Sequence, residues 1–153
     1  MNSVYMKIIG CMQVGGNCSW ILDSSLTNMS EIVDEIVLVG GSVSDDSKKI
    51  IARCNKVIET NFYSDNQSRI EWNDMNSLLR MAKNHDADWI LFMDADETFE
   101  PRFKITIRDH INNPDAGMYK FRRYWLWNTA KQYRVDRPEK FSSLAYNSYL
   151  VRS

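Results

Sequence analysis

One short run of the sequence constrains the fold more than any other. Residues 89–93 read WILFM, five consecutive apolar side chains that are entered from Asp88 and left through Asp94. A run this short, with aromatic and branched side chains and a charge at each end, favours a strand over a helix. Because every position is apolar rather than every second one, the strand should be buried on both faces, as in a parallel sheet.

The residues before this run alternate between strand and helix signals. Strands are predicted over residues 5–12, 35–39 and 56–59, and each is followed by helix-like spacing of apolar residues, most clearly over residues 75–82. Such alternation over about ninety residues predicts an α/β fold with right-handed crossovers. We therefore expect these strands and residues 89–93 to be parallel neighbours in one sheet.

The pattern changes in the second half of the chain. A helix is predicted over residues 101–112, and a long aromatic and basic strand over residues 117–127. A turn region over residues 128–140 and a last strand-like stretch over residues 141–152 follow. Because no repeat or linker interrupts the sequence, we expect one domain over residues 1–153.

Charge and apolar content exclude several classes of protein. Nineteen Lys and Arg against twenty Asp and Glu leave a net charge of −1, so a nucleic-acid partner is not expected. No stretch of about eighteen apolar residues predicts a transmembrane segment. The first apolar run is too short and too late for a signal peptide, so we expect a soluble, cytoplasmic protein.

The cysteines and histidines bear on metal binding. Cys11, Cys18 and Cys54 are odd in number and form no CxxC pair, which favours free core thiols over a disulfide framework or a zinc site. The two histidines have no metal-binding spacing. Any metal should therefore be held by oxygen ligands.

Ligands of open parallel sheets bind at the carboxyl ends of the strands. Two of the predicted strand ends carry glycine pairs, in Val14-Gly15-Gly16 and in Gly40-Gly41. Glycine lets a ligand approach the backbone closely, and the helix that follows offers free N–H groups. The alternative is that each pair only closes a tight turn.

The third strand end is acidic, with Asp94, Asp96 and Glu97 within four residues. Carboxylates this close repel one another and normally need a cation or a proton. A Mg²⁺ or Mn²⁺ ion held by one or two carboxylates, with water and phosphate oxygens, meets that need. The alternative is that Asp94 caps the next helix while the other two side chains are solvated.

These residues carry a resemblance. Residues 88–97, DWILFMDADE, resemble the DWILFLDADE signature of family 2 glycosyltransferases, which have the GT-A fold. Residues 32–39 resemble the second strand of these enzymes, and Asn76 with the two leucines at 78–79 resembles the helix before the Asp-x-Asp strand. Residues 133–136 resemble a stretch found in a bacterial and phage-like branch. The resemblance covers most of the chain in order and spacing.

The resemblance implies a GT-A-like, Rossmann-like, mostly parallel sheet flanked by helices, with a mixed C-terminal part. The first four strands should lie in the order third, second, first, fourth. Residues 1–97 would form the half that binds the nucleotide-sugar, and residues 98–153 a partial acceptor-side half.

The implied activity is metal-dependent transfer of a sugar from a nucleotide-diphospho-sugar donor to a hydroxyl of an acceptor, whether saccharide, lipid or protein. Asp94 and Asp96 would hold Mn²⁺ or Mg²⁺, with Asp94 also near the ribose. The residues expected to bind the donor are Val14, Gly15, Gly40, Asn76, Asp94 and Ala95.

A general base is less clearly marked. Asp136 is the best candidate for accepting the acceptor's proton, ahead of Glu139 and Asp115. The alternative is that Asp136 forms a surface ion pair with a neighbouring arginine. The aromatic residues of 119–127 suit stacking on sugars, and core packing is their alternative role.

The chain departs from the family pattern at several positions. Gly16-Asn17 stands where an Asn-Glu pair is usual, Gly40 where an aspartate is common, and Met75 where an arginine often precedes Asn76. The sequence also stops before an acceptor-side segment found in many relatives, so we expect a reduced or partial domain. Two alternatives stay open: a non-catalytic binding or assembly domain, and a sugar-phosphate nucleotidyltransferase, although the first glycine pair lacks a basic neighbour.

Overall fold

The structure is a computed structural model that describes residues 5–64, 71–122, 124, 126–127, 129–133 and 149–153. Six strands form one sheet in the order β3-β2-β1-β4-β8-β5. The strands of this sheet are β1 (Ile8–Gly15), β2 (Glu35–Gly41), β3 (Val57–Tyr63), β4 (Trp89–Asp94), β5 (Met118–Lys120) and β8 (Tyr149–Arg152). A second sheet pairs β6 (Leu126–Trp127) with β7 (Thr129–Tyr133).

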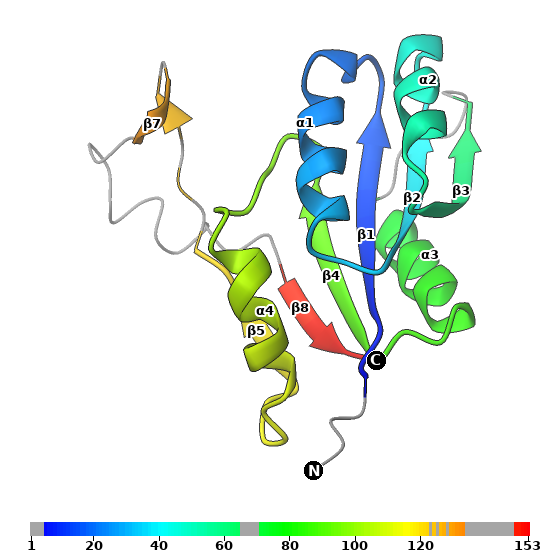
Figure 1. Ribbon diagram of the computed structural model, residues 1–153. Coiled ribbons are helices and arrows are strands. Elements are labelled where there is room, and N and C mark those ends of the chain that lie inside the picture. The colour runs from blue at the N-terminus through cyan, green and yellow to red at the C-terminus, as the bar shows by residue number, and fades with distance from the viewer. Residues whose placement is uncertain (1–4, 65–70, 123, 125, 128, 134–148) are drawn as a thin grey trace.

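Helices cover both faces of the large sheet (Figure 1). They are α1 (Ser19–Ser30), α2 (Asp45–Arg53), α3 (Glu71–Asn84) and α4 (Phe103–Ile111). Buried residues of α1, α2 and α4 join one hydrophobic cluster with the sheet, and those of α3 join the other. The sheet is therefore the middle of three layers, which agrees with the helix-flanked sheet that the resemblance implied.

Strand β4 confirms the expectation drawn from its sequence. Its apolar residues are all buried, with Phe92 the most exposed at 9%. Trp89, Leu91 and Met93 contribute to the cluster under α1 and α4, whereas Ile90 and Phe92 contribute to the cluster under α3. Successive side chains of a strand point to opposite faces, so an unbroken apolar run fills both cores.

The predicted strand order is also confirmed. β3, β2, β1 and β4 are consecutive parallel neighbours in the sheet. β8 then pairs antiparallel with β4, and β5 pairs antiparallel with β8. The C-terminal part of the sheet is thus mixed, as the resemblance implied.

The long strand expected over residues 117–127 is wrong. β5 ends at Lys120, and the Phe121 ring then packs edge-on against Phe99 at 5.2 Å and against Phe103 at 4.8 Å between centroids. The chain leaves the sheet at the residue where this contact begins. The turn expected over residues 128–140 is also partly wrong, because Thr129–Tyr133 form β7.

Two further predicted elements are present near the expected positions. The helix predicted over residues 101–112 is α4, and the last strand is β8, which occupies only the end of the predicted 141–152. Asp136 and Glu139 lie outside the described residues. Within the part of the chain that the structure describes, no helix is long and apolar enough to cross a membrane.

Candidate functional site

The predicted site residues of β1, β2 and β4 lie at or near the carboxyl edge of these central strands. β1 lies between β2 and β4, and its register pairs Gly15 with Gly41 on one side and Gln13 with Asp94 on the other. All three strands run in the same direction, toward the upper edge in Figure 1. The two glycine turns and the acidic turn therefore share one edge, as the sequence predicted.

Backbone hydrogen bonds join the two glycine turns. The N–H of Gly16 donates to the carbonyl of Gly41 over 3.2 Å, and the N–H of Ser44 donates to the carbonyl of Gly16 over 3.1 Å. Gly16 has φ +56° and Ser42 has φ +48°, so both turns pass through the left-handed region. The glycine at position 16 adopts this conformation without strain, and the pair of turns forms one connected surface.

Two predicted donor-binding residues lie beneath this surface. Val14 is fully buried, and Gly40 is buried with no room for a side chain. A Cβ on Gly40 would stand 1.9 Å from the carbonyl oxygen of Val14 and 3.1 Å from a methyl group of Val43. Gly15, in contrast, is partly exposed at the edge.

The helices after the turns begin at the same edge. Ser44 caps α2, where its side chain accepts a hydrogen bond from the N–H of Ser47. Asn17 does not cap α1: the N-cap is Cys18, without a side-chain hydrogen bond, and Asn17 instead accepts a hydrogen bond from Ser19. The first N–H groups of α1 are therefore not satisfied by a cap side chain.

Glu97 closes the acidic turn. Its carboxylate oxygen Oε2 accepts a hydrogen bond from the N–H of Asp94 over 3.1 Å, and its own N–H donates to the Asp94 carbonyl over 3.1 Å. Asp94 is half-buried and Asp96 is exposed. The three carboxylates thus divide into one that holds the turn and two at the rim.

Asp94 is not a helix cap. The next helix, α4, has Arg102 at its N-cap, without a side-chain hydrogen bond there. Eight residues separate Asp94 from Phe103, where α4 begins. The alternative role considered for Asp94 is therefore wrong.

The two rim carboxylates fit one type of cation site. In the described ranges, no group of three or more His, Cys, Asp or Glu side chains gathers closely enough to hold a metal ion. Asp94 and Asp96 alone suit a cation such as Mg²⁺ or Mn²⁺, which keeps several positions for water and phosphate oxygens. They do not suit an ion that needs a complete cage of protein ligands.

Polar residues that sequence reasoning missed border the same edge. Tyr63, at the end of β3, donates from its hydroxyl to both carboxylate oxygens of Asp74, over 3.1 and 2.9 Å. Asp74 is only 5% exposed, although Asn76, two residues later in α3, is exposed. Gln13 donates to the Glu71 carbonyl over 3.3 Å. The available signal was the place of Asp74 four residues before Leu78, on the apolar face of α3.

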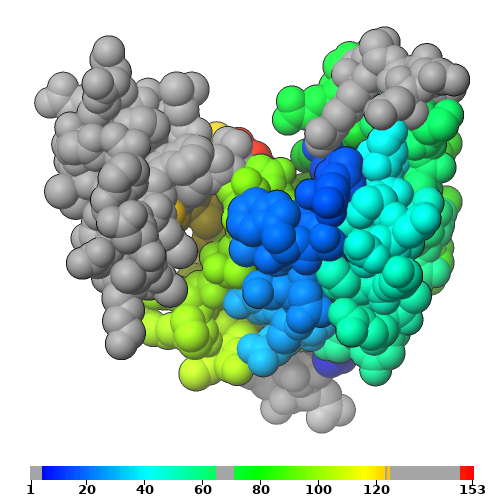
Figure 2. Space-filling model, turned by 90° about the horizontal axis from the view of Figure 1, so that it is seen from above, coloured from blue at the N-terminus to red at the C-terminus, as the bar shows by residue number. Residues whose placement is uncertain are grey.

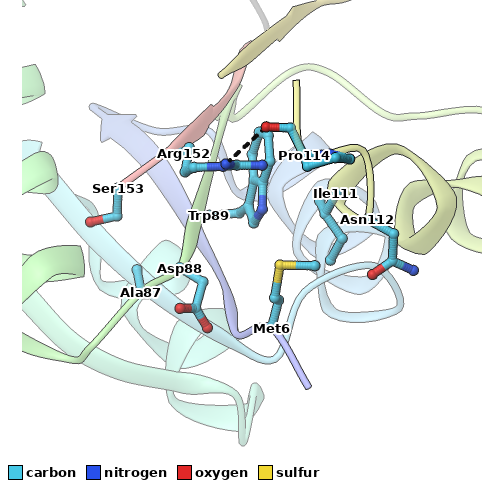
Figure 3. Close-up of a pocket in the computed structure, with 9 residues that line it drawn as sticks. All are labelled: Met6, Ala87, Asp88, Trp89, Ile111, Asn112, Pro114, Arg152 and Ser153. Carbon is cyan, nitrogen blue, oxygen red and sulfur yellow. Dashed lines mark hydrogen bonds between the residues drawn. The ribbon is translucent and has the colours of Figure 1, made fainter. Parts of the chain in front are cut away.

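A separate hollow lies at the opposite end of the sheet. It has a volume of about 430 Å³ and is lined by Met6, Asp88 and Trp89 among others (Figure 3). Arg152 lies over the Trp89 ring at 5.1 Å and donates to the Pro114 carbonyl. None of the residues predicted to bind donor or metal lines this hollow.

Asp115 belongs to that opposite end as well. It follows Pro114, which lines the hollow, and its N–H donates to the side chain of Asn113. The acidic turn lies at the other edge of the sheet, so Asp115 is wrong as a candidate base for chemistry there. Asp136 stays a prediction.

Comparison with known proteins places this geometry in context. No protein-family model matches the sequence, and no curated protein matches it. Solved structures do match. The mannosyltransferase PcManGT from Pyrobaculum calidifontis, in complex with GDP-Man and Mn²⁺, is 14% identical with a TM-score of 0.63, over 97% of this chain and 45% of that one.

Two further structures agree. Mannosyl-3-phosphoglycerate synthase from Rubrobacter xylanophilus is 13% identical, with a TM-score of 0.61 over 96% of this chain and 53% of that one. S. aureus TarS is 14% identical, with a TM-score of 0.62 over 96% of this chain and 47% of that one. This chain spans about half the length of these structures. At these identities the likeness concerns the fold, and the chain has the GT-A-like fold of glycosyltransferases.

Proposed function

We propose that this chain binds a nucleotide-diphospho-sugar at the carboxyl edge of its sheet and acts in metal-dependent transfer of the sugar to an acceptor hydroxyl. One observation carries the proposal: the β1 register brings Gly15, Gly41 and Asp94 to one edge. That edge combines close backbone approach with carboxylates, which are the groups that a nucleoside diphosphate and its cation require.

Asp94 and Asp96 are the proposed ligands of a Mn²⁺ or Mg²⁺ ion. The mannosyltransferase with a similar fold was solved with GDP-Man and Mn²⁺. A cation bound there would supply positive charge to offset the negative charge that develops on the departing diphosphate. The uncapped start of α1 adds N–H donors and a positive helix dipole at the same edge.

The residues of the chain itself would bind the donor and accept a proton in this reaction. The bond between the anomeric carbon and the diphosphate oxygen breaks, a bond to the acceptor oxygen forms, and the acceptor's proton must pass to a base. Asp136 is the proposed base. The glycine turns at Gly16 and Gly41 would bind the donor through backbone groups, because glycine carries no side chain that could make the contact.

A titration tests the binding step. UDP, GDP and CDP are each titrated into the full chain with and without Mn²⁺, and melting temperature is recorded in parallel. A ligand at a hundredfold excess over its Kd should add about 2.7 kcal/mol of stability. Absence of metal-dependent binding for all three nucleotides would contradict the proposal.

A second experiment tests turnover. A panel of mass-tagged nucleotide sugars is incubated with the chain and Mn²⁺, and release of the nucleoside diphosphate is followed. Transfer or hydrolysis supports a catalyst, whereas metal-dependent binding without either product favours the non-catalytic alternative. Formation of a nucleotide sugar from a nucleoside triphosphate and a sugar phosphate would favour the nucleotidyltransferase alternative.

A further inference from the structure

Helix α1 holds the segment that follows β4 at two points. The first is Ser25, whose side chain is fully buried at 0% exposure. Its hydroxyl donates to the carbonyl oxygen of Ala95 over 2.6 Å. Ala95 lies between the two carboxylates at the rim, so this bond fixes the backbone at the centre of the acidic turn. Figure 2, which looks onto the carboxyl edge, shows α1 beside the residues that follow β4.

The second point is Asn28, one turn further along α1. Its Nδ2 donates to the carbonyl oxygen of Phe99 over 3.0 Å, and its Oδ1 accepts from the N–H of Phe99 over 2.7 Å. One amide side chain thus satisfies both backbone groups of one residue. A paired contact of this kind fixes orientation as well as position.

The side chain of Phe99 is anchored on its other side. Its ring stacks on Phe103 of α4, with 4.3 Å between centroids, and meets the edge of Phe121 at 5.2 Å. Phe99 is therefore fixed through its backbone by α1 and through its ring by the aromatic cluster of Phe99, Phe103 and Phe121. Asp96 lies in the short segment between the two points that α1 holds.

Simple packing does not explain the polar residues at these positions. Ser25 lies on the face of α1 that buries Leu22, Leu26 and Met29. A hydroxyl on a buried face is unfavourable unless it forms a hydrogen bond. The shorter hydrogen bond of the Ser25 hydroxyl goes to the acidic turn, at 2.6 Å, whereas the distance to the Ile21 carbonyl is 3.4 Å.

We infer that Ser25 and Asn28 are positioning residues for the cation site, which preset the backbone of Asp96 relative to Asp94. The inference rests on the proposed function, since it assigns these residues a task in binding the ion. A turn that is already ordered loses less conformational entropy when the ion binds. Mutation of residues that hold metal ligands in place commonly lowers metal affinity by roughly ten- to a hundredfold.

The experiment compares matched variants on one helix. Ser25→Ala removes the bond to Ala95, whereas Ser30→Ala removes a bond of 2.8 Å from the Ser30 hydroxyl to the Thr27 carbonyl, away from the acidic turn. Asn28→Ala is paired in the same way with Thr27→Ala, an exposed neighbour. Mn²⁺ affinity is measured by electron paramagnetic resonance in the presence of the nucleoside diphosphate that binds the unmodified chain.

The expected result is a loss of Mn²⁺ affinity of roughly tenfold or more in Ser25→Ala and Asn28→Ala, and no change in either control. If the unmodified chain binds Mn²⁺ and the two test variants bind it equally well, the inference is overturned while the proposed function stands. If the unmodified chain binds no Mn²⁺, the proposed function is overturned, and the assigned task falls with it.

A readout without metal follows the order of the turn itself. In the ion-free chain, the backbone order parameter of the Asp96 amide should be near that of rigid backbone, about 0.85, and should fall below about 0.6 in Ser25→Ala. Ser30→Ala should leave it unchanged. An equally ordered Asp96 amide in Ser25→Ala would overturn the inference even if that variant were less stable overall.

Discussion

The carbonyl oxygen of Val14 lies directly against Gly40, so that a Cβ built on this glycine would stand 1.9 Å from the oxygen. Both residues belong to neighbouring parallel strands and are partners in register. The close contact brings β1 and β2 together immediately below the glycine turns. The absence of a side chain at position 40 is therefore a condition for the geometry of the proposed donor site.

Gly40→Ala should destabilise the fold, because backbone atoms cannot move aside as a flexible side chain can. Overpacking of a filled core typically costs about 1–3 kcal/mol and can cost more. Urea denaturation measures the change. Gly117→Ala is the matched control, since a Cβ there meets nothing within 4 Å, and its effect should be within about 0.5 kcal/mol. Equal effects of the two substitutions would contradict the contact.

Asp34 joins the start of β1 to α4. It accepts hydrogen bonds from the N–H of Ile8 and from Arg108, both over 2.8 Å, and from the hydroxyl of Tyr5. Asp34→Ala would leave these donors without their acceptor, so we expect a loss of about 1–3 kcal/mol in the free energy of unfolding. The control Asp23→Ala removes an exposed pair with Arg53 and should cost about 0–1 kcal/mol.

The same cluster predicts a pH dependence. The pKa of Tyr5 is raised above its usual value of 10.0, chiefly because its hydroxyl donates a hydrogen bond to Asp34. Desolvation and the negative charge of Asp34 raise this pKa further, whereas Arg108 lowers it. Since the folded-state pKa is the higher one, the contribution of Tyr5 to stability is fully present below pH 10 and is lost as the pH rises through the raised pKa. The stability difference between the unmodified chain and Tyr5→Phe should therefore shrink from pH 8 to pH 11. A constant difference would contradict the hydrogen bond.

The three cysteines differ in accessibility. All three are free thiols, as the sequence predicted. The sequence also predicted that all three lie in the core, but only Cys11 is buried, whereas Cys18 and Cys54 are partly exposed. Burial raises the pKa of the Cys11 thiol, which disfavours the reactive thiolate. Iodoacetamide should modify Cys18 and Cys54 in the native protein much faster than Cys11, and all three in urea. Mass spectrometry of the time course gives the modification rate of each cysteine. Modification of Cys11 as fast as that of Cys18 and Cys54 in the native protein would contradict the prediction.

Local sequence patterns were sufficient to predict the strands of the central sheet, but not the strands of the C-terminal part. The apolar run of β4 and the spacing of α3 encode their burial directly, because each pattern repeats with the period of its element. The end of β5 has no such signal. The contact of Phe121 with Phe99 and Phe103 joins residues distant in sequence, and an aromatic strand pattern is compatible with either outcome.

The candidate site also contains residues that the sequence predicted and residues that it did not. Its turns were predictable because glycines and acids directly follow strong strands. Ser25, Asn28 and Asp74 were not, since single polar residues on a helix usually face solvent and their partners lie elsewhere in the chain. Ser25 and Asp74 each lie on the apolar face of a helix, which hinted that they have a buried partner but not which one.

Asp96 provides the most direct test of the cation site. Its side chain is exposed at the rim, so Asp96→Asn should leave the melting temperature of the ion-free chain unchanged or slightly raised, because it relieves repulsion with Asp94. The same change should remove Mn²⁺-dependent nucleotide binding. Asp94→Asn should do so to a lesser degree, since an amide can keep a neutral hydrogen bond to the ribose. Glu97→Gln is the control, because its side-chain oxygen can still accept the bond from the N–H of Asp94. Calorimetric titration of nucleoside diphosphate with and without Mn²⁺ measures these effects. If Asp96→Asn binds as tightly as the unmodified chain, the ion is held elsewhere. The same conclusion follows if Glu97→Gln loses binding as completely as Asp96→Asn.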